Sequence, residues 1–257
     1  MRGFGERAAF YLGFAAGGIW FFVCSAVGLL GLLLSGGSRI FVFLFARAFC
    51  GGMVRLMGWR IAIEHRERLS ATRPCVFVGN HQSIMDLLTY GSFVPTKTVA
   101  VGKKEIGRIP LFGWFFRFSG NLVIDRGNSE DARRLLEEAA GRLKHEGISV
   151  FFMPEGHRGK GEELLPFKTG AFRLAAAAGV PVVPVVAEPL TVIVDTAGRR
   201  ARRGVYRFRI LEPAPCPGGG EEEIAAAAAA VRQRMQLAFE ELSARAPLST
   251  VPTPARD

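Results

Sequence analysis

The pattern of apolar and polar positions separates an uncharged N-terminal stretch from the rest of the chain. Residues 8–34 contain no charged side chain. As a helix this stretch would be about 40 Å long, against roughly 30 Å of hydrocarbon in a bilayer. It is too long for the apolar region of a cleaved signal peptide, and no small-residue cleavage site follows it. The stretch therefore predicts attachment to a membrane.

A second apolar segment, residues 40–59, is interrupted by charge. Arg47, Gly51 and Arg55 are spaced four apart and share one helical face, with phenylalanine and leucine on the others. This pattern is typical of a helix that lies in the membrane interface rather than crossing it. We expect residues 1–59 to form a membrane-associated helical hairpin.

Arginines flank both ends of this N-terminal region. Arg2 and Arg7 precede the first segment, and Arg39 and Arg60 bracket the second. A single membrane span would place one of these basic clusters outside, against the positive-inside tendency. A hairpin that enters and returns keeps both clusters on one side. We therefore expect the hairpin to lie at the cytoplasmic face of the cell inner membrane, with the remaining domain in the cytoplasm.

From residue 60 onward, short apolar runs alternate with amphipathic stretches. Strands are predicted at 61–63, 75–79, 98–102, 122–125, 148–153 and 182–187. Helices are predicted at 83–93, 129–146, 169–178 and 221–242. The alternation predicts an α/β domain over residues 60–243, with a mixed, mostly parallel sheet flanked by helices. Residues 244–257 are predicted to be a disordered tail.

Two further runs, 190–195 and 205–211, are expected to pair as a hairpin at the edge of the sheet. Arg207 and Arg209 alternate with apolar residues and would share one exposed face. With the four arginines of the intervening turn they would form a six-arginine cluster, completed by Arg199, Arg200, Arg202 and Arg203. Such a cluster suits anionic lipid, an acidic acyl carrier protein or the phosphates of coenzyme A. A solubilising surface hairpin is the equal alternative.

Charge and cysteine content narrow the classes of partner and compartment. The formal net charge of +10 indicates an anionic partner: a membrane surface, nucleic acid, or an acidic protein or substrate. The four cysteines lie far apart and form no CxxC pair, so we expect neither a disulfide framework nor a zinc site. The absence of an expected disulfide framework fits a reducing compartment.

The run at 75–79 delivers a histidine to the point where a strand gives way to a helix. His81 follows Gly79 and Asn80, and Asp86 follows five residues later. The pair suits a general base and its orienting carboxylate at the carboxyl edge of a sheet. The alternative is a helix-capping histidine with Asp86 on a solvated helix face. The spacing alone leaves both interpretations open.

Polar residues also follow two later strands. Arg126 follows the strand at 122–125, Glu155 and Arg158 follow the strand at 148–153, and Lys168 lies beyond. Arginines in such places bind phosphate well, because the guanidinium is bidentate and always charged. A salt bridge of Arg126 with a neighbouring carboxylate and a loop ion pair of Glu155 and Arg158 are the alternatives. No GxSxG, GxxxxGK[ST] or strand-linked GxGxxG motif is present.

Six stretches between residues 60 and 190 together resemble the glycerolipid acyltransferase family, which contains the 1-acylglycerol-3-phosphate acyltransferases. They follow the order of the family's motifs: NHQSIMD at 80–86, KKEI with IPLFGW at 103–114, GNLVIDR at 120–126, MPEGHRG at 153–159, FKTG at 167–170 and VPVVPV at 180–185. The fourth departs from the family's FPEGTRS, because Met153, His157 and Gly159 replace Phe, Thr and Ser. His157 therefore leaves the exact acceptor headgroup open.

The resemblance implies the glycerolipid acyltransferase fold and a specific reaction. A fatty acyl group would pass from acyl-CoA or acyl-carrier protein to the sn-2 hydroxyl of 1-acylglycerol 3-phosphate, giving phosphatidic acid. It implies His81 as base with Asp86, and an acceptor-binding set of Arg126, Glu155, Gly156, Arg158 and Lys168. No cofactor, metal or nucleic acid is expected, and the partners are the bilayer, the lysophospholipid acceptor and the acyl donor.

Two alternatives to this reaction stay open. A related enzyme of the same class would act on glycerol 3-phosphate, another lysolipid or an amino-acid lipid. A protein of a different class would bind membrane lipid without catalysis.

Overall fold

The computed structural model describes residues 2–125, 129–159, 163–195, 198–216, 218 and 220–245. Within these residues one sheet has seven strands. They are β1 Trp59–Glu64, β2 Val76–Gly79, β3 Thr98–Lys103, β4 Leu122–Ile124, β5 Ser149–Phe152, β6 Val182–Ala187 and β9 Gly204–Ile210. Their spatial order is β1-β9-β6-β2-β5-β3-β4.

The sheet is mixed and mostly parallel, as predicted. Strands β6, β2, β5, β3 and β4 run parallel to one another. Strand β9 runs antiparallel to β6, and the edge strand β1 runs parallel to β9. The carboxyl ends of five neighbouring strands therefore lie along one edge of the sheet, where sites form in open α/β folds.

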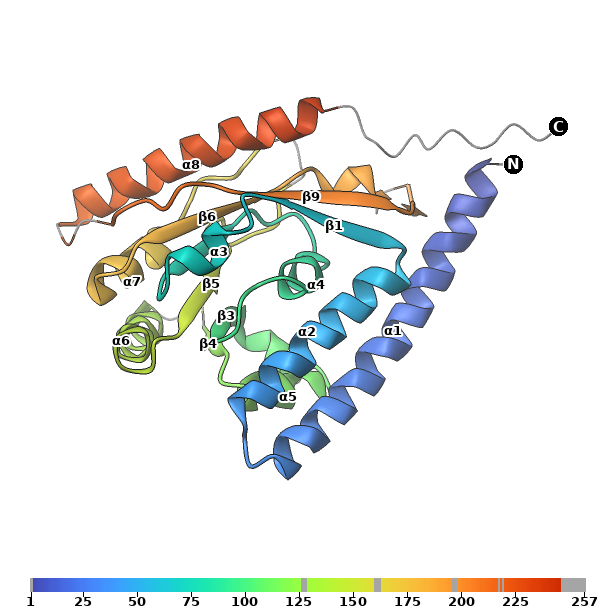
Figure 1. Cartoon of the computed structure of the whole chain (residues 1–257), viewed down its shortest axis with the longest axis horizontal. Coiled ribbons are helices and arrows are strands. Elements are labelled where there is room, and N and C mark those ends of the chain that lie inside the picture. Colours follow the sequence, from blue (N-terminus) through green and yellow to red (C-terminus); the bar gives the residue numbers. More distant parts are fainter. Residues whose placement is uncertain are drawn as a thin grey trace.

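Helices cover both faces of this sheet (Figure 1). Their bounds are α1 Arg2–Leu34, α2 Arg39–Leu56, α3 Arg68–Ala71, α4 Asp86–Gly91, α5 Phe112–Phe118, α6 Ser129–Glu146, α7 Gly170–Ala178 and α8 Glu221–Ala244. Short 3₁₀ turns span η1 Lys104–Arg108 and η2 Leu190–Val192. One apolar core joins the sheet to α2, α4 and α5, and a second joins its other face to α6, α7 and α8. Strands β2 and β6 are buried along their whole length, as expected for central strands of a parallel sheet covered on both faces.

The first two helices pack closely as an antiparallel pair. A Cβ on Gly31 would lie 2.1 Å from the Phe41 ring, and one on Gly52 would lie 2.4 Å from the Trp20 ring. The two helices join through Gly36 and Gly37, which have φ of +62° and +81°. The predicted hairpin is therefore present as a structural unit, and α1 also packs on α5.

Helix α1 is long and apolar enough to cross a membrane by length and composition. Its stretch Gly5–Leu34 has a mean hydropathy of 2.1 over the most apolar window. An exposed apolar stripe runs along it through Leu12, Ile19, Val23 and Val27.

The predicted hairpin of 190–195 with 205–211 is wrong. Strand β9 lies inside the sheet between β1 and β6, and the residues before it form η2 and a separate short pair. That pair consists of β7 Val194–Asp195 and β8 Arg200–Ala201. The register of β9 on β1 comes from contacts about 145 residues apart, such as Glu64 with Arg209, which a local pattern does not reveal.

The exposed face predicted for Arg207 and Arg209 is also wrong. The Arg207 side chain is buried and pairs with Glu188. The Arg209 side chain is 11% exposed and pairs with Glu64 and Glu241. Helix α8 supplies Glu241 over the face that the alternation placed in solvent. The six-arginine cluster is therefore divided, with Arg199, Arg202 and Arg203 remaining exposed.

The predicted boundary at residues 59 and 60 stays a prediction. Phe49 and Met53 of α2 lie in the same apolar core as Phe77 and Phe208 of the sheet. The predicted tail falls mainly on residues 246–257, which lie outside the described residues.

Candidate active site

Polar side chains gather where the parallel strands end. His81 follows β2, Lys104 follows β3, Asp125 follows β4 and Glu155 follows β5. Because these strands are parallel neighbours, their carboxyl ends meet at one edge of the sheet. The polar residues that follow several strands therefore lie along one edge of the sheet.

The His81 ring contacts the Asp86 carboxylate directly. Nδ1 of His81 lies 2.8 Å from Oδ2 of Asp86. The same oxygen accepts hydrogen bonds from the backbone N–H groups of Gln82 at 2.6 Å and Ser83 at 2.8 Å. Asp86 is 1% exposed, so the alternative of a solvated helix face is excluded.

This contact determines which ring nitrogen is available for chemistry. A carboxylate that accepts from two backbone donors also accepts from an imidazole Nδ1–H, which leaves the lone pair on Nε2. The His81 side chain is 19% exposed, so the ring is partly open to the surface. The arrangement suits a general base with its orienting carboxylate, and these roles stay a prediction.

The main chain of His81 is held on both sides by the loop that follows β5. Its N–H donates to Oε1 of Glu155 at 2.7 Å, and its carbonyl accepts from the Gly159 N–H at 2.7 Å. The other oxygen of Glu155 accepts from the Leu165 N–H at 2.9 Å. Glu155 is 3% exposed, and burial raises the pKa of its carboxyl group. Both carboxylate oxygens thus accept from backbone N–H groups, and the predicted contact of Glu155 with the acceptor stays a prediction.

Two residues of the NHQSIMD stretch tie this loop to the end of β6. The Asn80 amide accepts from the Ala187 N–H at 2.8 Å and donates to the Ala187 carbonyl at 3.0 Å. The Gln82 amide donates to the Glu188 carbonyl at 2.9 Å and accepts from the Leu190 N–H at 2.9 Å. Sequence reasoning assigned no role to Gln82 or Glu188, because Gln82 meets residues 188 and 190 across more than 100 positions.

The remaining predicted acceptor-binding residues are spread around the site. Arg158 is exposed, as is Lys168, whose backbone N–H donates to the Pro154 carbonyl at 2.9 Å. Gly156 is buried with φ +73°, and the Lys168 side chain lies against it. Arg126 lies outside the described residues. Phosphate binding by this set stays a prediction.

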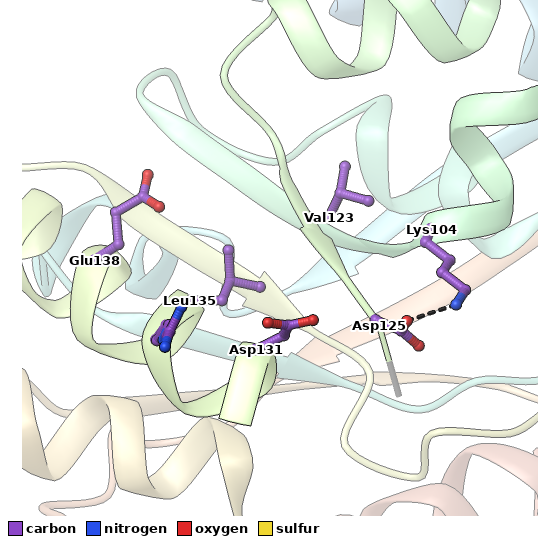
Figure 2. A pocket seen from close by; sticks show the side chains of 7 residues that line it. Lys104, Val123, Asp125, Asp131, Leu135 and Glu138 are labelled. Atoms are coloured by element: carbon purple, nitrogen blue, oxygen red, sulfur yellow. Dashed lines mark hydrogen bonds and ion pairs between the residues drawn. The ribbon is translucent and has the colours of Figure 1, made fainter. Parts of the chain in front are cut away.

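A cavity of about 320 Å³ lies beside the end of β4 (Figure 2). Lys104 forms an ion pair with Asp125 at its rim, and this contact raises the pKa of Lys104. Asp131 and Glu138 of α6 line the cavity as well, together with Arg134. Carboxylates outnumber cations in this set, so these described residues alone do not make a phosphate site.

No metal centre is evident in the part of the chain that the structure describes. Its His, Cys, Asp and Glu side chains include no group of three or more that could hold an ion. All four cysteines are free.

Comparison with known proteins links this site to an enzyme family. A family model described as Acyltransferase matches residues 60–188. A 1-acyl-sn-glycerol-3-phosphate acyltransferase from Haemophilus influenzae is 40% identical over 148 residues, covering 56% of this chain and 60% of that protein. The beta form of the enzyme of the same name from Homo sapiens is 32% identical, covering 77% of this chain and 71% of that protein.

A solved structure is similar over nearly the whole chain. The crystal structure of the 1-acyl-sn-glycerophosphate acyltransferase from Thermotoga maritima aligns with a TM-score of 0.73 and 26% identity. It covers 95% of this chain and 98% of that chain. By sequence, the match spans 55–60% of the length of the first bacterial relatives.

Proposed function

Because this chain belongs to the acyltransferase family, we propose that it transfers a fatty acyl group to the sn-2 hydroxyl of 1-acylglycerol 3-phosphate, giving phosphatidic acid. The donor is acyl-CoA or acyl-carrier protein. The observation that carries this proposal is the 2.8 Å contact of His81 Nδ1 with buried Asp86, which leaves Nε2 as the basic atom. The donor is a substrate, and the proposed reaction needs no cofactor.

His81 Nε2 takes the proton of the acceptor hydroxyl as the hydroxyl oxygen attacks the thioester carbonyl carbon. The tetrahedral intermediate then collapses, the carbon–sulfur bond breaks, and the imidazolium gives its proton to the leaving thiolate, which restores neutral His81. Asp86 stabilises that imidazolium, as in a hydrolase triad without its serine. Because the thioester is already activated, no enzyme nucleophile is required. General-base assistance contributes about 10²–10⁴-fold.

The acceptor phosphate is held by Arg126, Arg158 and Lys168 near Gly156. Guanidinium groups suit a phosphate because they pair with it in a bidentate manner. Two of these side chains are exposed beside the loop that braces His81, which supports the assignment. Glu155, which the resemblance places in the acceptor-binding set, also positions His81 through its contact with the backbone N–H.

The protein works on the cytoplasmic face of the inner membrane, with α1 and α2 embedded in the near leaflet. Helix α1 contacts the domain from Glu6, which pairs with Arg202, to Phe21, whose ring packs on Phe112 of α5. A helix docked along this length lies beside the domain. Its exposed apolar stripe, together with exposed Trp114 of α5, suits contact with lipid.

The test is acyl transfer by the purified chain and by His81→Ala. The panel of acceptors comprises 1-acylglycerol 3-phosphate, glycerol 3-phosphate, other lysophospholipids and an amino-acid lipid, each with acyl-CoA and acyl-carrier protein. We expect transfer to 1-acylglycerol 3-phosphate that is lost in the variant. If the chain prefers another acceptor, we would attribute that preference to His157, which replaces the threonine of the family's motif. No transfer to any acceptor would indicate a lipid-binding protein without catalysis.

A further inference from the structure

A second groove lies between α2 and β1, at the sheet edge away from the His81 loop. Its volume is about 570 Å³. Its apolar lining comes from Val54 of α2, from Trp59, Ile61 and Ile63 of β1, and from Phe93 after α4. None of the residues that bind or position His81 lines this groove. It is therefore distinct from the candidate active site.

Four arginines line the same groove: Arg47, Arg55, Arg60 and Arg66. All four are exposed, and within the described ranges none has a carboxylate partner. The acidic residues near β1 are engaged elsewhere, since Glu64 pairs with Arg209 and Arg245, and Glu67 lies 3.8 Å from His65. Four cations without an anion make the groove complementary to a phosphate.

The apolar part of the groove indicates that the anion carries a hydrocarbon chain. At one end the groove is bounded by Leu44, which is 59% exposed, and Ile40 one turn earlier is 73% exposed. Burying one acyl chain along these side chains is favourable by about 0.8 kcal/mol per CH₂ group. A soluble anion would leave the same surface in water. Phosphate and hydrocarbon together are the chemistry of a phospholipid.

Gly51 keeps the groove open on the helix side. A Cβ on Gly51 would lie 3.4 Å from Nη1 of Arg55, so the guanidinium group extends over the glycine. A larger side chain here would displace that guanidinium and fill the groove without changing its charge. Gly51 is within α2, where leucine is a better helix former than glycine.

We propose that this groove holds an anionic phospholipid of the bilayer, with its phosphate against Arg47, Arg55, Arg60 and Arg66. One acyl chain lies along the apolar lining toward Leu44. The site is separate from acyl transfer and goes beyond the proposed function. It ties the sheet edge to a membrane that carries negative charge.

The experiment measures energy transfer from tryptophan to a dansyl-labelled lipid in zwitterionic detergent micelles. Trp59 lines the groove and is the donor that reports its occupancy; W20F/W114F removes the other two tryptophans. We expect labelled phosphatidylglycerol to bind at least tenfold more tightly than labelled phosphatidylcholine, and this preference to fall as salt rises. The assay contains no acyl donor, so its result is independent of the proposed reaction.

Three further variants test separately the charge of the groove, the shape of the groove, and the charge of a surface away from it. In the same background, R55E/R66E and G51L should each reduce the preference to less than threefold. K144E, on exposed Lys144 of α6, should retain it. Circular dichroism and gel filtration check folding, and R66E alone replaces the double variant if that variant misfolds.

Other outcomes would overturn the proposal. Equal binding of the two lipids, or a preference that survives both R55E/R66E and G51L, would exclude this groove as the site. Displacement of the lipid by free coenzyme A or by inorganic phosphate, at constant ionic strength, would assign the groove to a soluble anion.

Discussion

The backbone N–H of His81 donates to the buried carboxylate of Glu155 at 2.7 Å, across 74 positions of sequence. The loop after β5 therefore determines where the loop after β2 holds its histidine. The proposed catalytic base is therefore held by the loop after a neighbouring strand as well as by Asp86.

Glu155→Gln should lower kcat with little change in the KM of the acceptor. A glutamine offers one acceptor oxygen where the carboxylate offers two, so either the His81 or the Leu165 N–H loses its partner. Leaving one such donor unpaired costs about 1–3 kcal/mol, and a 1 Å shift of a catalytic group costs about 10²-fold in rate. Steady-state kinetics with varied acceptor checks this. A raised acceptor KM at unchanged kcat would instead support acceptor binding by Glu155.

Asp86→Asn should reduce kcat by up to about 10⁴-fold, by analogy with other histidine–aspartate pairs. The asparagine oxygen can still accept from the Gln82 and Ser83 N–H groups, so the loop should stay folded. The same oxygen can also accept from Nδ1–H, but it carries no negative charge, so the imidazolium that forms in the proposed reaction loses its stabilisation. Single-turnover rates measure the effect, with thermal unfolding as the control. Wild-type rates in this variant would rule out stabilisation of the imidazolium by the charge of Asp86.

Arg207→Ala should destabilise the fold by about 3–5 kcal/mol, because it leaves the Glu188 carboxylate buried without its cation. E188Q/R207M should recover most of that loss. Unfolding in urea at neutral pH measures both variants. A loss below 1 kcal/mol in Arg207→Ala would show that water reaches Glu188.

The same variant should also depend on pH in a defined direction. Burial raises the pKa of Glu188, and Arg207 opposes that rise. Without Arg207 the folded-state pKa lies further above its ordinary value. The folded state then holds its proton while the unfolded state releases it, so the free energy of unfolding falls as pH rises through that window. Arg207→Ala should therefore unfold more readily at pH 8 than at pH 5, relative to wild type.

Cys75 should resist alkylation in the folded protein. Burial raises the pKa of its thiol to about 11, and the side chain is fully buried. Only the thiolate reacts, so the rate should climb about tenfold per pH unit up to that value. Iodoacetamide labelling of C24S/C50S/C216S, with and without urea, measures this. Equal rates in both conditions would contradict the burial of Cys75.

The hydrophobic pattern along the chain predicted those features whose residues lie close together in the sequence. The apolar runs at β2 and β6 and the amphipathic period of α6 fixed those elements to within a few residues. His81 and Asp86 meet because five residues span one short turn, so their pairing was open to prediction from spacing and motif together.

Long-range contacts account for what the sequence did not reveal. The alternation around Arg207 and Arg209 is that of a half-exposed strand, but Glu188 and Glu241 meet those side chains from other elements. The bracing of His81 by Glu155 is equally hidden, because a carboxylate bound to backbone N–H groups has no partner side chain to suggest it.

The placement of α2 has a consequence for attempts to obtain the catalytic domain without detergent. Phe49 and Met53 fill the same interior as Phe77 and Phe208. Cutting the chain before β1 would uncover that interior instead of releasing a soluble enzyme. A water-soluble form requires polar replacements on the outer surface of α1, at positions such as Leu12 and Ile19, with both helices retained.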